Sequence, residues 1–130
     1  MRVLLPTGWP RPRGYSNGVA ARGEMVFVAG MVGWDAAGQF ASDTLAGQAR
    51  QALENVVAVL SEAGAKPEHI VRMTWYVLDK RAYRDAASEL GAIYREIIGS
   101  YNAAMSAVEV SALMEDAALV EIEVTAVVPD

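Results

Sequence analysis

Three glutamates, Glu109, Glu121 and Glu123, are the side chains best suited to proton transfer in this sequence, because each falls within a predicted strand. A carboxylate held in a partly buried cleft can take a raised pKa and then exchange protons near neutral pH. The alternative role for these carboxylates is a structural ion pair, with Arg72 or with arginines of another subunit. The residues themselves leave both roles open.

Other common catalytic chemistries lack the residues that they need. The sequence contains no cysteine and one histidine, His69, which precedes a predicted strand and is expected at the surface. Disulfides, thiol nucleophiles and a site that binds metal through His and Cys are therefore excluded. Ser16, Ser106 and Ser111 have no plausible histidine base for a serine triad. We expect no metal site.

The composition indicates one domain, residues 1–130, with a packed core. Hydrophobic residues make up 53% of the chain, and no apolar run approaches the roughly 20 residues that a membrane helix needs. The opening stretch MRVLLPTGWP is too short for a signal peptide, so we expect a cytoplasmic protein without membrane contact. The net charge of −5 argues against nucleic-acid binding. We interpret the basic N-terminal part, which carries Arg2, Arg11, Arg13 and Arg22, as a solvated arm.

Hydrophobic periodicity predicts an α+β fold with the element order β-β-α-β-α-β-β. The predicted elements are strands at 15–21 and 24–32 with a turn between them, a helix at 44–63, a strand at 69–79, a helix at 80–98, and strands at 104–112 and 119–128. Asp43 and Asp79 are suited to cap the two helices. Each helix connects strands by a crossover, so both helices are expected on one face of the sheet.

Side-chain alternation divides this sheet into an apolar face, which receives the helices, and a mixed face. The apolar face includes Val71, Met73, Trp75 and Val77. We assign to the mixed face Arg72, Thr74, Tyr76, Met105, Ala107, Glu109, Glu121, Glu123 and Thr125. A face with charges of both signs fits a subunit interface, and left open it would leave a small domain short of buried area. We therefore expect a homo-oligomer with small-molecule clefts between its subunits.

Several stretches also carry a family pattern. The matching stretches, which cover most of the chain, are GYSNGV (14–19), VFVAGMVGWD (26–35), QARQALENVVAVLSEAG (48–64), HIVRMTWYVLD (69–79) and SAVEVSALMEDAALVEIEVTAV (106–127). The pattern SAVEV, followed after a gap by VEIE, is specific in combination. In these features the sequence resembles the Rid family (RidA, also called YjgF), small proteins that hydrolyse reactive enamines and imines.

The resemblance implies a chorismate mutase-like two-layer sandwich, with a mixed six-stranded sheet and two helices on one face. Members are usually homotrimers in which the sheets form an inner β-barrel, and equivalent clefts between subunits bind a small molecule. The resemblance also implies that neither a metal nor an organic cofactor takes part.

The family pattern implies site residues as well. Tyr15 matches a tyrosine that lines the pocket, and Glu121 matches the glutamate that positions the attacking water. Met105 stands where active deaminases have an arginine that binds the substrate carboxylate. The other predicted substrate-binding residues are Gly30, which matches the glycine of an S-G-Q stretch, its neighbours Ala29 and Met31, and Ala107.

Methionine at position 105 changes the expected substrate. It offers no hydrogen-bond donor, and loss of a buried charge-assisted partner costs about 2–5 kcal/mol of ligand binding. Activity on generic 2-imino acids is therefore expected to be absent or very weak, and Ala29, Met31 and Met105 make the pocket more apolar.

Two functions remain open on these grounds. We predict a divergent enamine/imine deaminase for a less polar substrate, or for an acid held elsewhere by Arg13 or Arg72. The alternative is a homotrimer that binds a metabolite or partner protein without chemistry. A ribonuclease or translation inhibitor, as older labels of the family have it, finds little support in the acidic charge and single histidine.

Overall fold

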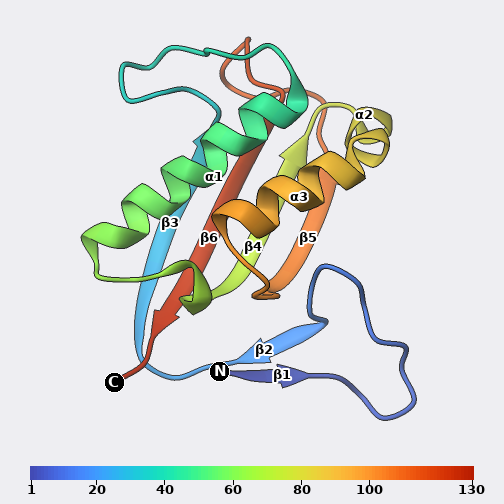
Figure 1. The fold of residues 1–130 in the computed structure, drawn as a ribbon, viewed down its shortest axis with the longest axis vertical. Coiled ribbons are helices and arrows are strands. Elements are labelled where there is room, and N and C mark those ends of the chain that lie inside the picture. Colours follow the sequence, from blue (N-terminus) through green and yellow to red (C-terminus); the bar gives the residue numbers. More distant parts are fainter.

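The computed structural model describes residues 1–130 and confirms the predicted α+β class. Its elements in chain order are β1 (Arg2–Leu4), β2 (Gly18–Ala20), β3 (Glu24–Val32), α1 (Leu45–Glu62), the short 3₁₀ helix η1 (Pro67–His69), β4 (Ile70–Val77), α2 (Lys80–Asp85), α3 (Ala87–Ile97), β5 (Ala104–Glu109) and β6 (Val120–Val128). Figure 1 shows two layers, with α1 and α3 lying over the same face of the main sheet. No helix has both the length and the hydropathy needed to cross a membrane.

The strands form a four-stranded sheet in the order β3-β6-β4-β5 and a separate pair, β1-β2. β6 runs antiparallel to β3 and β4, whereas β4 and β5 are parallel. The chain thus crosses over from β3 to β4 through α1, and from β4 to β5 through α2 and α3. Both crossovers advance in the same direction across the sheet. Because such crossovers are right-handed, both place their helices on one face.

The strands of the N-terminal part pair differently from the sequence prediction. The predicted pairing of strands 15–21 and 24–32, and a single sheet of six strands, are wrong for this structure. β2 has only three residues, and it pairs with β1 instead of β3. An isolated parallel bridge between Ser16 and Ala104 links the N-terminal segment to β5. Figure 1 accordingly shows β1 and β2 at one end of the main sheet.

The helix boundaries follow the predicted caps with two differences. Thr44, rather than Asp43, caps α1, since its hydroxyl accepts a hydrogen bond from the Gly47 amide. Asp79 caps α2 as predicted, with its carboxylate accepting from the amides of Arg81 and Ala82. The predicted second helix is divided at Ala86, whose φ of −88° and ψ of 6° leave the helical range.

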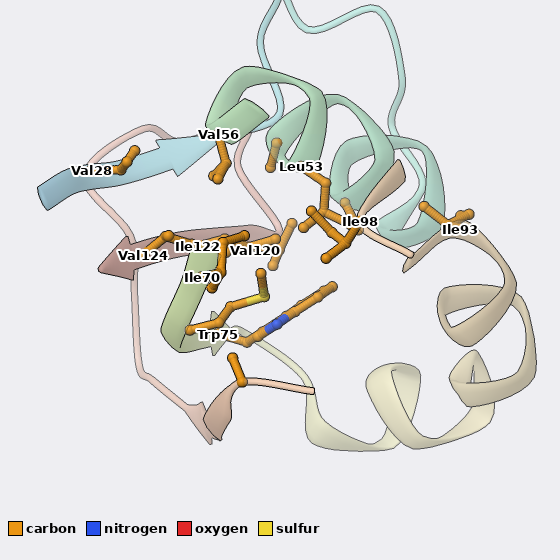
Figure 2. Packing of buried hydrophobic residues seen from close by; sticks show 14 of the residues in the cluster. Val28, Leu53, Val56, Ile70, Trp75, Ile93, Ile98, Val120, Ile122 and Val124 are labelled. Carbon is orange, nitrogen blue, oxygen red and sulfur yellow. The ribbon is translucent and has the colours of Figure 1, made fainter. Parts of the chain in front are cut away.

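The core fills the space between the helices and the main sheet. Leu53, Val56 and Leu60 of α1 are completely buried against the inner residues of β4 and β6, as Figure 2 shows in part. The predicted inward positions on β6 are confirmed by Val120, Ile122, Val124 and Ala126. On β4 the register shifts between Ile70 and Arg72, which makes Ile70, not Val71, the buried residue at that end.

Candidate functional site

A pocket of about 430 Å³ lies where α3, the β4–β5 edge and the segment before β2 meet. Fourteen residues line it: Arg13, Gly14, Tyr15, Trp75, Tyr83, Ala87, Leu90, Gly91, Tyr94, Arg95, Gly99, Ser100, Asn102 and Met105. This volume is within the range of small-molecule sites. Because its lining combines aromatic rings with a few polar groups, the pocket is the main candidate for ligand binding.

Ser16 fixes the segment that carries Tyr15 to the wall of this pocket. Its amide donates to the Ala103 carbonyl at 2.9 Å, and its hydroxyl donates to the Asn102 carbonyl at 2.8 Å. Gly14 has a φ of 79°, a conformation that side chains other than glycine rarely adopt. Ser16 is 5% exposed, so its role is structural rather than nucleophilic.

Aromatic rings form the inner wall. Trp75 and Tyr83 meet edge to face, with ring centroids 5.9 Å apart and an interplanar angle of 64°. The Tyr94 hydroxyl donates to the Tyr101 carbonyl at 2.8 Å. Burial raises the pKa of Tyr83, and it raises the pKa of Tyr94 to about 12, so both phenols stay neutral at physiological pH. The predicted core position of Trp75 is confirmed, since it is 3% exposed. Its indole Nε1 finds no hydrogen-bond partner in the chain.

Met105 lies on the helix side of the sheet, so its predicted place on the mixed face is wrong. In the parallel β4–β5 pair, Met105 is in register with Met73 and Ala107 with Trp75, and partners in register share a face. Met105 packs against the core and lines the pocket. Glu109, in register with Val77, falls on the same side. The sequence showed the alternation along this strand but not its phase relative to β4.

The open face of the sheet therefore carries a different set of residues. β5 contributes Ser106 and Val108, which are in register with Thr74 and Tyr76 of β4. Apolar side chains are exposed there as well: Met25 is 58%, Phe27 70% and Val108 44% exposed. The face remains mixed in character, as predicted, but with more exposed apolar surface.

Glu121 lies on this open face, against β3. It is in register with Tyr76 on one side and Val32 on the other. β3 has an irregularity between Val28 and Met31, and Gly30 falls within it. A Cβ atom built on Gly30 would lie 2.3 Å from Oε2 of Glu121. The carboxylate thus rests directly on the glycine backbone, where a larger residue would displace it.

The other two candidate glutamates have partners within the chain. Glu109 Oε1 accepts a hydrogen bond from the Lys80 amide at 2.9 Å, at the start of α2. Glu123 Oε1 accepts from the Tyr76 hydroxyl at 2.5 Å, and this bond raises the pKa of Tyr76. The predicted pairing with Arg72 does not occur within the chain, since the one ion pair joins Arg50 and Glu96.

The remaining predicted residues are divided between the two faces. Met31 is in register with Ile122 and packs against the core, so it faces the helices. Ala29 is exposed and lines a hollow on the open face with Phe27, Arg72 and Glu123. Ala107, in register with Trp75, lies on the helix side and not on the predicted mixed face, where it is exposed and does not line the pocket.

One chain therefore does not bring the predicted site together. Tyr15 and Met105 meet at the pocket on the helix side, whereas Gly30 and Glu121 meet on the open face. A site that uses both groups requires two copies of the chain.

Two residues outside the predicted set complete the wall and rim of the pocket. Tyr94 and Arg95 of α3 line it together with Tyr83 and Leu90. The spacing of Leu90 and Tyr94, at i and i+4, places both on one face of α3 and was a usable signal for this wall, whereas Tyr83 reaches it from α2.

His69 and the acidic residues offer no metal centre. The Nδ1 atom of His69 accepts a hydrogen bond from the Lys66 amide at 2.9 Å, which stabilises the turn before β4. No three His, Asp or Glu side chains come together as a metal site would require.

Comparison with known proteins assigns the chain to a family. Residues 10–128 match the family model described as Endoribonuclease L-PSP. A RutC family protein of Pyrococcus horikoshii is 33% identical over 126 residues, which cover 95% of each chain. A protein of Salmonella typhimurium named 2-iminobutanoate/2-iminopropanoate deaminase is 35% identical over 108 residues, covering 81% of this chain and 79% of that protein.

Solved structures agree with this assignment. A Rid-family protein of unknown function from Yersinia pestis superimposes with a TM-score of 0.86 at 33% identity, covering 98% of both chains. The YjgF gene product of E. coli gives a TM-score of 0.70 at 31% identity, again over 98% of both chains. The predicted resemblance to the Rid family is thereby confirmed, and the chain belongs to the Rid (YjgF) family.

Proposed function

We propose that this protein is an enamine/imine deaminase whose site forms between two copies of the chain. The pocket of one copy binds the substrate, and Glu121 of the next copy positions a water molecule. The water oxygen adds to the C=N carbon and the nitrogen takes up a proton. The nitrogen then takes the hydroxyl proton of this addition product as the C–N bond breaks, which releases ammonia and leaves a carbonyl product.

The free carboxylate of Glu121 carries this proposal. Glu109 and Glu123 are each engaged by a hydrogen bond of 2.9 Å or less, whereas Glu121 has neither a hydrogen bond nor an ion pair within the chain. It is also half-buried, which suits a group that must hold a water molecule. The name of the Salmonella typhimurium relative supports the reaction type.

The proposed assembly is a homotrimer in which open sheet faces meet. Exposed Met25, Phe27 and Val108 form apolar surface on a face that also carries Arg72 and Glu123. Contact between copies would remove this surface from water. It would also bring the open face of one copy to the edge of the next, as a shared site requires.

The test uses imines generated in solution from amino acids, with the keto product and ammonia measured together. Glu121→Gln keeps the size of the side chain but removes its charge, and should lower kcat by about 10²- to 10⁴-fold. Glu123→Gln is the matched control on the same strand and face, and should retain most of the activity. An unchanged rate in Glu121→Gln would remove this residue from the mechanism.

Binding without chemistry is the second candidate function, and Met105 favours it. The family resemblance implies an arginine at this position, and methionine supplies no donor for a carboxylate. Saturable binding of ligands in calorimetry, without keto product from any imine of the panel, would support this second function over the first.

A further inference from the structure

All the charged side chains that line the pocket are positive. Among its fourteen lining residues the charged ones are Arg13 and Arg95, and there is no carboxylate. The chain as a whole carries a net charge of −5. An acidic protein thus has a locally positive pocket, which favours an anionic ligand.

Neither guanidinium is used by the chain itself. The one ion pair joins Arg50 and Glu96, and neither Arg13 nor Arg95 makes a side-chain hydrogen bond. Both residues are exposed at the rim, one on the segment before Tyr15 and the other on α3. A Cβ built on Gly91 would lie 3.3 Å from Nη1 of Arg95, so this guanidinium lies over the α3 backbone at the pocket wall.

The interior beneath these arginines is apolar. Trp75, Leu90 and Met105 line it with the neutral ring of Tyr83. Met105 has no donor, and the Trp75 Nε1 is buried. The interior therefore suits the apolar part of a ligand, and the rim suits its charge.

We propose that the pocket selects carboxylic acids with an aromatic or branched apolar body. The body lies against Trp75, Tyr83 and Met105, and the carboxylate is bound at the rim by Arg13 and Arg95. In a pocket of about 430 Å³, an acid of only a few carbon atoms would leave most of this apolar wall uncovered. This inference rests on the proposed function only in calling the acid a substrate.

The test measures binding of stable probes that cannot react. Phenylacetate carries both features, phenylacetamide lacks the charge, and acetate lacks the ring. Calorimetry on the full chain should rank phenylacetate first. In a Trp9→Phe/Trp34→Phe background, Trp75 is the single tryptophan, and its fluorescence should change on binding. Phenylacetamide binding as well as phenylacetate would overturn the role of the charge.

Substitutions of the two rim arginines test where the carboxylate of the ligand binds. Arg13→Gln and Arg95→Gln should each weaken phenylacetate about 3- to 10-fold and leave phenylacetamide nearly unchanged. Arg84→Gln is the matched control, since Arg84 is an exposed arginine that does not line the pocket. Equal affinity for phenylacetate in all three variants would overturn the proposal.

Measuring turnover as well as binding distinguishes this inference from the proposed function. The unmodified chain is assayed both for phenylacetate binding and for turnover of a panel of imines. Binding with the predicted selectivity, but no turnover of any imine, would reject the deaminase and keep the specificity. Turnover restricted to small imines, without phenylacetate binding, would support the deaminase and reject the proposed specificity.

Discussion

Met105 and Glu121 lie on opposite faces of one sheet. Across β5, β4 and β6, Met105 is in register with Met73, which is buried beneath the helices, whereas Glu121 is in register with Tyr76 on the open face. Each chain therefore presents a ligand pocket on one side and a free carboxylate on the other. Repeating this arrangement around a closed ring would give every pocket a carboxylate from its neighbour.

Mixed oligomers test whether the site is shared. Ala87→Trp fills the pocket from an exposed position, and Glu121→Gln removes the carboxylate. Each variant alone should be inactive. Equal co-assembly of the two should recover about one quarter of the normal activity, because half of the pockets and half of the glutamates are intact and combine independently.

The mixing experiment also has an outcome that would reject a site shared between copies. If pocket and glutamate acted within one chain, no mixed oligomer would contain an intact site and the activity would stay at zero. Mass measurement of the mixed sample, with one variant carrying an affinity tag, provides the control that the two chains have assembled together.

Met105→Arg should shift the preference toward small 2-imino acids. An arginine here would reach the pocket with a guanidinium that can bind a carboxylate through two charge-assisted hydrogen bonds. We expect kcat/KM for 2-iminopropanoate to rise about 10- to 100-fold. Met105→Leu is the control and should change little. An unmodified chain that already matches the arginine variant on this substrate would show that Met105 does not limit it.

Gly30→Ala should impair catalysis more than folding. The added methyl group would lie 2.3 Å from Glu121 Oε2, and the flexible carboxylate can move aside at little cost in stability. A displacement of about 1 Å lowers a catalytic rate by about 10²-fold. Gly18→Ala is the control, since its Cβ meets only Leu4, at 3.4 Å. Equal kcat in Gly30→Ala and the unmodified chain would contradict the placement of Glu121.

The sequence predicted the layers better than it predicted the site. The period of 3.6 residues in α1 and the alternation in β4 and β6 identified the buried positions, because burial acts on every turn of a helix and every second residue of a strand. The phase of β5 is set by its pairing with β4, which alternation within β5 does not reveal. Met105 was consequently placed on the wrong face.

Local sequence patterns could not predict the pairing of β1 with β2 or the residues that line the pocket either. β1 and β2 are so short that their pairing depends on tertiary contacts such as the Ser16–Ala104 bridge. Arg95 gave no sequence signal, because an exposed arginine on a helix usually faces solvent. Its place at the pocket follows from the packing of α3 beside β5.

Phe27→Glu should dissociate the proposed oligomer. Phe27 is 70% exposed on the open face, where a contact between copies would bury it, and a buried unpaired carboxylate is strongly unfavourable. Light scattering should show the mass of one chain. Met114→Glu is the control, because Met114 is 94% exposed in the loop before β6 and should leave the assembly intact. A single-chain mass for the unmodified protein would reject the homotrimer.

Tyr94 should make the protein less stable at alkaline pH. Burial raises its pKa to about 12 from the ordinary value of 10.0, so the folded state holds the proton more tightly than the unfolded state. This contribution is fully present below pH 10 and is lost as the pH rises from about 10 to about 12. Urea unfolding midpoints should therefore fall across that range.

Tyr94→Phe should flatten this alkaline loss. It also removes the hydrogen bond to the Tyr101 carbonyl, so its stability near pH 8 should be lower by about 0.5–1.5 kcal/mol. Tyr101→Phe is the matched control, because its ring is exposed and the carbonyl acceptor is retained. The same slope between pH 10 and 12 in Tyr94→Phe as in the unmodified chain would show that another group causes the alkaline loss, since Tyr83 is also buried with a raised pKa.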